Sequence, residues 1–185
     1  MMLKNRLTAL VTVAAIAVPA LALAASKYSK ADGDSYVHVG CKAVGLSFTA
    51  KANPSNIKVE DDGTVIKVTL VDGNKLKTDN DGRDKHMREK IFAKVKSPTV
   101  VLTVTHADLD AGLKSGNVKA SLKFADKPTK SVTIKDAKLA NGIATGKIST
   151  KRSELGVPEA CFIDGVGPCV KDELEVDASI HVKTE

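Results

Sequence analysis

The chain has very little aromatic character. Its 185 residues include no Trp, two Tyr and four Phe, which together make up 3% of the sequence. Proteins that bind single-stranded nucleic acid stack the bases on exposed aromatic side chains, and this composition cannot supply such a surface. Charge is also modest, with 28 Lys and Arg against 22 Asp and Glu. A mixed surface of net charge +6 does not require a polyanionic partner, so we expect no nucleic-acid partner.

Catalytic and metal-binding motifs are lacking as well. The sequence contains no G-x-S-x-G elbow, P-loop, H-E-x-x-H or C-x-x-C. The adjacent carboxylates Asp61-Asp62 and Asp172-Glu173 fall in turn segments, where acidic residues are common. The four His are scattered along the chain without the spacing of metal ligands. We therefore predict that the protein is not an enzyme and has no catalytic residues, no metal site and no resident cofactor.

Cysteine is scarce, with three residues. Cys161 and Cys169 flank the turn-rich segment FIDGVGP, so we predict a disulfide between them in an oxidising compartment. Cys41 lies in an apolar stretch and is interpreted as a buried thiol. A metal ligand and a bridge between two chains are its alternatives, and both a monomer and a homodimer stay open.

The N-terminus has the pattern of a secretory signal peptide. Lys4 and Arg6 precede an uncharged, mostly apolar segment that ends in the small residues Ala22-Leu23-Ala24. An uncleaved membrane anchor is the alternative, since about 20 apolar residues can span a bilayer. We predict a signal peptide over residues 1–24 and one exported domain over residues 25–185.

Cleavage would place the domain in the periplasm or outside the cell. It would remove two of the 28 basic residues, leaving 26 against 22 acidic ones and a net charge of +4. Lysines on outward strand faces usually serve solubility and block edge pairing. They can also attract an anionic membrane surface, so a transient membrane contact is a second partner hypothesis.

The dominant hydrophobic period is two, which is typical of half-buried antiparallel strands. Turn signals such as Asp61-Asp62-Gly63, Ser115-Gly116-Asn117 and Asn141-Gly142 separate the alternating runs. Eight or nine strands with short connections favour an all-β barrel, because an open sheet of that size exposes long edges. The runs span residues 37–41, 44–48, 57–59, 66–70, 100–104, 118–124, 132–134, 143–150 and 174–182.

One segment departs from this period. Residues 83–96 place Met87, Ile91 and Val95 four residues apart among charged side chains, which predicts a short amphipathic helix. Pro98 would stop it. We expect the apolar face of this helix to cover one end of the barrel.

The inward positions of the strands are mostly Val, Ile, Leu and Ala, which fill space poorly. An eight-stranded barrel can be packed solid or can hold one small ligand, and periodicity does not distinguish the two. A hollow, dry interior of this kind would suit an extended hydrocarbon, since each buried methylene contributes about 0.8 kcal/mol.

The segment KLKTDNDGRDKHMREKIFAKVKSP contains a distinctive set of positions, which are Thr78, Arg83-Asp84, His86-Met87, Phe92 and Pro98. A late strand-and-turn at 148–157 and a closing strand at 174–182 follow it. In these segments the chain resembles the YceI-like family of polyisoprenoid-binding, lipocalin-like domains, and the similarity extends over roughly residues 36–183. Residues 124–130 and Glu154-Leu155 depart from the family pattern.

The resemblance implies an all-β, eight-stranded antiparallel lipocalin-like barrel in the periplasm, with one short helix. It further implies that an isoprenoid chain, either a polyprenyl lipid or a quinone tail, binds inside for storage or transport. The alternative is a structural or stress-response exported β-protein with a filled core and no ligand. We expect Arg83, Asp84 and His86 to hold the helix entrance in place without touching the ligand.

The candidate ligand-binding residues are the apolar helix positions and the inward strand positions. They are Met87, Ile91, Phe92, Val100, Leu102, Val104, Val118, Leu122, Phe124, Val132, Ile134, Leu174, Val176 and Ile180.

Overall fold

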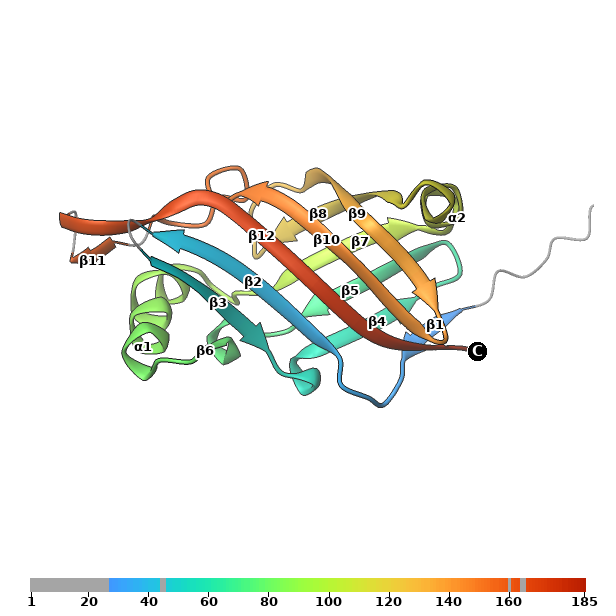
Figure 1. Ribbon diagram of the computed structural model, residues 1–185, viewed down its shortest axis with the longest axis horizontal. Coiled ribbons are helices and arrows are strands. Elements are labelled where there is room, and N and C mark those ends of the chain that lie inside the picture. The colour runs from blue at the N-terminus through green and yellow to red at the C-terminus, as the bar shows by residue number, and fades with distance from the viewer. Residues whose placement is uncertain (1–26, 44–45, 160, 164–165) are drawn as a thin grey trace, which may run out of the picture.

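The computed structural model describes residues 27–43, 46–159, 161–163 and 166–185 (Figure 1). The predicted signal peptide over residues 1–24 lies outside the described residues. Within these described ranges, no helix is both long and apolar enough to cross a bilayer.

The chain folds into one curled antiparallel sheet (Figure 1). Its hydrogen-bonded order is β4-β5-β7-β8-β9-β10-β12-β2-β3-β6, with β1 and β11 each paired to β12. The strands are β1 (Tyr28–Lys30), β2 (Tyr36–Ala43), β3 (Leu46–Ala52), β4 (Ile57–Asp61), β5 (Val65–Leu70), β6 (Lys77–Thr78), β7 (Val100–Thr105), β8 (Asn117–Phe124), β9 (Lys130–Ala140), β10 (Ile143–Lys151), β11 (Cys161–Ile163) and β12 (Val166–Thr184).

The pairing register explains why the sheet has one apolar face. Leu102 on β7 lies opposite Leu122 on β8, and Val118 on β8 lies opposite Ile134 on β9. Directly opposed residues of antiparallel strands point to the same side of the sheet. The alternating runs therefore add up to a continuous apolar inner surface, and Val118 within it is fully buried.

The longest strand, β12, joins most of the sheet together. It pairs with β10 on one side and β2 on the other, while its ends pair with β1 and β11. The two strands that end the path, β4 and β6, are not hydrogen-bonded to each other. The sheet is therefore a curled, lipocalin-like half-barrel.

Helix α1 (Asp81–Lys90) lies at one end of the sheet, close to β6 (Figure 1). It starts at the N-cap Asn80, whose side-chain oxygen accepts a hydrogen bond from the Arg83 N–H at 2.9 Å. The predicted helix over residues 83–96 therefore begins two residues earlier. It also ends sooner, because the chain continues as a 3₁₀ turn, η3 (Phe92–Lys94), that buries Phe92.

A second helix, α2 (His106–Ser115), was not predicted. The Thr105 hydroxyl accepts a hydrogen bond from the Asp108 N–H at 3.0 Å, and Gly116 ends the helix with φ of +73°. A Thr-x-x-Asp cap followed by a C-terminal Gly is a known helix signature. The sequence thus contained a helix signal, but the helical segment is short and lies between two clear strands.

The lipocalin-like antiparallel fold predicted from the sequence is confirmed, although the strand count differs. Each of the nine predicted runs falls in a strand wherever the structure describes its residues. The three that the pattern missed, β1, β6 and β11, have two or three residues each, too few to show alternation. Short 3₁₀ turns, η1 (Pro54–Asn56) and η2 (Gly73–Lys75), complete the connections.

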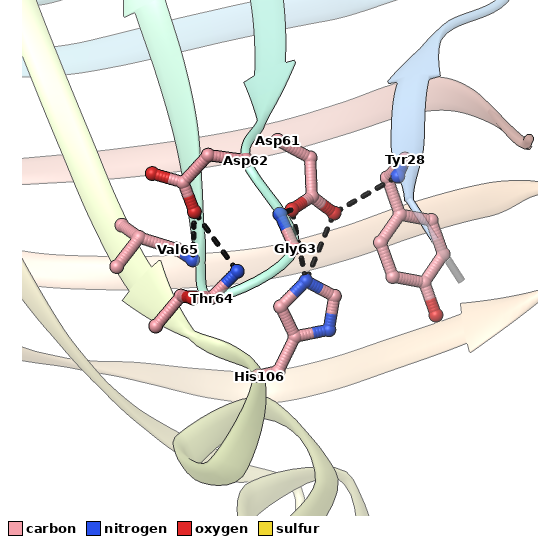
Figure 2. A network of polar contacts seen from close by, with 7 residues as sticks. All are labelled: Tyr28, Asp61, Asp62, Gly63, Thr64, Val65 and His106. Carbon is pink, nitrogen blue, oxygen red and sulfur yellow. Dashed lines mark hydrogen bonds and ion pairs between the residues drawn. The ribbon is translucent and has the colours of Figure 1, made fainter. Parts of the chain in front are cut away.

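A buried carboxylate ties three separate elements together at the end opposite α1. Figure 2 shows Asp61, at the end of β4, beside the ring of His106, the first residue of α2. Both carboxylate oxygens lie 2.9 Å from His106 Nε2. The backbone N–H groups of Tyr28 and Gly63 also donate to this carboxylate, at 2.9 and 2.8 Å. The network fastens β1 to the turn after β4 and to the start of α2.

The side chain of Asp61 is fully shielded from solvent. Burial is the largest influence on its pKa and disfavours the charged form, but the hydrogen bonds from His106, Gly63 and Tyr28 together outweigh it. The pKa of Asp61 consequently lies below its ordinary value. Folding therefore favours the ionised carboxylate.

We predict that the D61N variant unfolds more readily than the wild type. Losing hydrogen bonds to a charged group should lower the free energy of unfolding by about 2 kcal/mol. Urea denaturation at neutral pH measures this difference. Because the folded-state pKa is depressed, the difference should narrow as the pH falls below about 4, the ordinary Asp pKa.

A matched control is D110N, which makes the same change at an exposed position of α2. Its effect should stay within about 0.5 kcal/mol. Equal stability of D61N and D110N would contradict the structural role of the Asp61 network.

Candidate functional site

The curled sheet encloses a cavity of about 810 Å³. Small-molecule sites in proteins usually measure about 300–1,000 Å³, so this cavity can hold a ligand. Its wall consists mainly of Val, Leu, Ile, Ala, Phe and Met side chains. Inward side chains are aliphatic and short, so the centre of the half-barrel stays unfilled. The site is therefore an apolar hollow.

The structure brings most of the candidate residues together on this wall. Val132 is the exception: it is half-buried and packs against the main core but does not line the cavity. The thirteen that do line it are Met87, Ile91, Phe92, Val100, Leu102, Val104, Val118, Leu122, Phe124, Ile134, Leu174, Val176 and Ile180.

Both helices contribute to the wall. From the α1 side, Met87 and Phe92 are buried and line one end of the cavity, as expected for a helix that covers a barrel end. From α2, Leu109 and Leu113 line it, and neither was predicted from the sequence. They lie four residues apart and so share one face of the helix.

The exposed lining residues show where the cavity meets solvent. Leu46, Asn80 and Gly82 are exposed and line the wall around the N-terminus of α1 and the tip of the β2–β3 hairpin. Among the described residues that line the cavity, Lys138 on β9 is the one other exposed residue. We call the first region, defined by Leu46, Asn80 and Gly82, the mouth. At the far end, Tyr28 of β1 lines the wall beside the Asp61 network.

The model of the YceI-like domain family matches residues 26–182 of this chain. The chain belongs to the YceI-like family. No curated protein matches the sequence.

A solved structure has the same fold as this YceI-like domain. It is a polyisoprenoid binding domain from Saccharophagus degradans implicated in plant cell wall breakdown, and it superposes with a TM-score of 0.54. The alignment covers 85% of this chain and 98% of that chain, at 15% sequence identity. At this identity the similarity shows the fold alone. The family resemblance seen in the sequence is confirmed by the family-model match.

The Arg83-Asp84-x-His86 element of this YceI-like protein divides into two roles. Asp84 is buried and does not line the cavity, as expected for a residue that holds the helix. Arg83 and His86, in contrast, both line the cavity wall. The sequence predicted that all three hold the helix entrance without touching the ligand, and that stays a prediction; Arg83 and His86 share the cavity side because residues i and i+3 of a helix lie on one face.

Asp84 fastens α1 to β6. Its carboxylate accepts hydrogen bonds from the N–H and the hydroxyl of Thr78, both at 2.7 Å, and lies 3.5 Å from Lys77 Nζ. Burial, the largest influence, opposes ionisation, but these partners outweigh it and hold the pKa of Asp84 below its ordinary value. The helix that carries Arg83 and His86 therefore has a fixed position at the mouth.

The three cysteines differ in oxidation state. The predicted disulfide between Cys161 and Cys169 is confirmed and lies where β11 pairs with β12. These two sulfurs and Glu159 form the one three-residue group of potential metal donors among the described residues. Because both thiols are used in the disulfide, this group offers no ligand set for a metal. Cys41 is a free thiol on the cavity wall, half-buried, which agrees with its interpretation as a small apolar residue.

We predict that Cys41 reacts slowly with alkylating reagents in the folded protein. Burial raises the pKa of its thiol to about 11. At pH 8 this leaves about a hundredfold less reactive thiolate than an ordinary Cys has. Iodoacetamide labelling followed by mass spectrometry measures the rate. The same protein in urea, with the disulfide intact, is the control, and equal rates in both states would contradict the buried position.

Proposed function

We propose that this YceI-like protein binds an isoprenoid chain inside its cavity and holds it for storage or transport. The observation that carries the proposal is the cavity of about 810 Å³ with a predominantly apolar wall. A branched hydrocarbon tail is complementary to such a wall in shape and polarity. A polyprenyl lipid and an isoprenoid quinone both carry such a tail.

Burial of the tail can supply the binding free energy. Each buried methylene contributes about 0.8 kcal/mol, so several isoprene units stabilise a complex without any directional contact. The structural neighbour from Saccharophagus degradans is described as a polyisoprenoid binding domain, which supports the same ligand class here. This family of binding domains also agrees with the prediction that the chain is not an enzyme.

The alternative from the sequence was an exported β-protein with a filled core and no ligand. A cavity of this size does not fit a filled core, since native interiors contain few voids larger than a water molecule. Export to the periplasm or beyond remains part of our proposal. It is supported by the signal-peptide pattern and by a family match that starts at residue 26, just after the proposed cleavage site.

Lipid extraction tests the proposal directly. Native protein purified without detergent should release an isoprenoid lipid into organic solvent, in an amount close to one molecule per chain. Mass spectrometry identifies and counts it. Absence of lipid, together with no binding of added geranylgeraniol by the emptied protein, would contradict the proposal.

We further predict that the A178F variant loses most prenol binding. Ala178 is half-buried on β12 and lines the cavity, so a phenyl ring at this position occupies the volume that the tail needs. Affinity for geranylgeraniol should fall at least about tenfold, which corresponds to about two methylenes of burial. Calorimetric titration measures the affinity, and a thermal melt verifies that the variant is folded.

The matched control is A140F, the same substitution at an exposed position at the end of β9 that does not line the cavity. Its affinity for geranylgeraniol should equal that of the wild type. If A178F binds as well as A140F, the ligand does not occupy the interior.

A further inference from the structure

The positive charge of this protein is concentrated on three neighbouring strands. Residues 117–151, which contain β8, β9 and β10, carry eight Lys and two Asp. The rest of residues 27–185 carries 18 basic and 20 acidic side chains. The three strands are hydrogen-bonded neighbours in the sheet, so their charges gather in one region (Figure 1). The protein is therefore asymmetric in charge, although its net charge is modest.

The alternation of side chains directs three of these lysines away from the cavity. Leu122 of β8 and Ile134 of β9 line the cavity wall, so the next residue along each strand lies on the outer side of the sheet. These residues are Lys123 and Lys135, and Lys119 shares the side of Lys123. All three lysines are exposed. We call the outer surface defined by Lys119, Lys123 and Lys135 the basic face.

Hydroxyl groups surround the lysines of the basic face. A groove on this surface is lined by Ser121 of β8 and by Ser131 and Thr133 of β9, together with Lys119 and Lys135. Ser121 lies directly opposite Ser131 in the sheet, and Thr133 lies opposite Lys119. Ammonium and hydroxyl groups both donate hydrogen bonds to anionic oxygens. The basic face therefore presents many donors for such oxygens over two adjacent strands.

Nearby carboxylates leave the basic face unneutralised. Among the residues that the structure describes, none of its three lysines has a carboxylate within ion-pair distance. Asp136 lies 3.5 Å from Lys147, and Asp126 lies 4.0 Å from Lys127, so the two acidic residues of this region have other partners. Strands β7 and β8 contain no acidic residue.

The remaining acidic groups mark the limits of the basic face. Asp108 and Glu154 also line the groove, and the carboxylate of Asp108 accepts a hydrogen bond from the Thr105 hydroxyl at 2.7 Å. On β12, Glu173 and Asp177 lie opposite residues 151 and 147 of β10. The outer side of the sheet thus changes from basic to acidic between β9 and β12.

Edge protection does not explain these lysines. Lysine on an edge strand blocks pairing with another sheet, but β8 pairs with β7 and β9, and β9 pairs with β8 and β10. A surface that serves solubility alone has both signs of charge interspersed. The basic face has one sign on two interior strands, which indicates an anionic partner that is broad enough to contact both.

We propose that the basic face docks on an anionic membrane surface, with its ammonium and hydroxyl groups on lipid phosphates. The choice of a membrane rests on the proposed function, since a long isoprenoid chain resides in bilayers until a protein takes it up. The outward positions of β8 are polar, so the contact is made with head groups and not by insertion. Each lysine near an anionic surface strengthens binding about fivefold, which makes the docking reversible.

Sedimentation with vesicles tests the proposal. Vesicles of equal parts phosphatidylglycerol and phosphatidylcholine, at low salt, should bind the protein about a hundredfold more tightly than pure phosphatidylcholine vesicles. This is the combined effect of three lysines. Raising the salt to about 0.5 M should remove most of the preference, because screening acts on charge. Equal binding to both kinds of vesicle, or binding to neither, would overturn the proposal.

Variants assign the docking to the basic face. The double variant K119Q/K123Q should bind the anionic vesicles about 25-fold more weakly than the wild type. The double variant K119R/K123R keeps both charges and should bind nearly as the wild type does. The matched control is K171Q/K183Q, which removes two charges from exposed positions of β12, outside the basic face, and should have little effect. Circular dichroism verifies the fold of each variant.

The outcomes separate this inference from the function on which it rests. Geranylgeraniol added without vesicles should bind K119Q/K123Q as tightly as the wild type. If geranylgeraniol binds but anionic vesicles do not, the docking proposal is wrong and the isoprenoid function stands; the reverse result contradicts the function. If K171Q/K183Q loses as much vesicle binding as K119Q/K123Q, the attraction belongs to net charge. If a short DNA duplex binds as tightly as the anionic vesicles at the same salt, the face is a general polyanion site. Either result overturns the assignment to a membrane-docking face.

Discussion

The alternation of side chains along curled antiparallel strands is the constraint on which the rest of this structure depends. It directs every second residue of the long strands inward, and here those residues are aliphatic and mostly small. Their burial stabilises the sheet, but they are too short to meet at the centre. The hollow loses dispersion contacts that a filled core would have, and an inserted hydrocarbon tail restores those contacts.

The two ends of the hollow are built differently, and this gives the cavity a direction. At the far end, Asp61 fixes β1 and α2 through His106 and two backbone amides, with its charge fully buried. At the mouth, Asp84 fixes α1 to β6 and leaves the neighbouring Arg83 facing the cavity. Two buried aspartates thus hold the ends in place, while the long wall between them supplies apolar area.

Much of the fold followed from local patterns, and the failures have local reasons. The nine long strands show clear alternation, but β1, β6 and β11 are too short to show any. Helix α2 had a capping signal in Thr105 and Asp108. The helix was not predicted because it has only ten residues and lies between two clear strands. Val132 shares the apolar face of β9 but lies where the sheet packs against the core. Whether an inward residue meets the core or the cavity depends on sheet curvature, which periodicity does not contain.

The amino-acid sequence by itself determined the all-β class, the inward face of each long strand, the helix near residue 83, the disulfide partners and the family resemblance. Each of these depends on residue spacing over short distances or on a matching motif. The volume of the hollow, the roles of Arg83 and Asp84, and the network around Asp61 were decided only by the tertiary structure. They depend on how the sheet curls and on which distant segments come into contact. Residues 28, 61 and 106, for example, become neighbours only when the chain has folded.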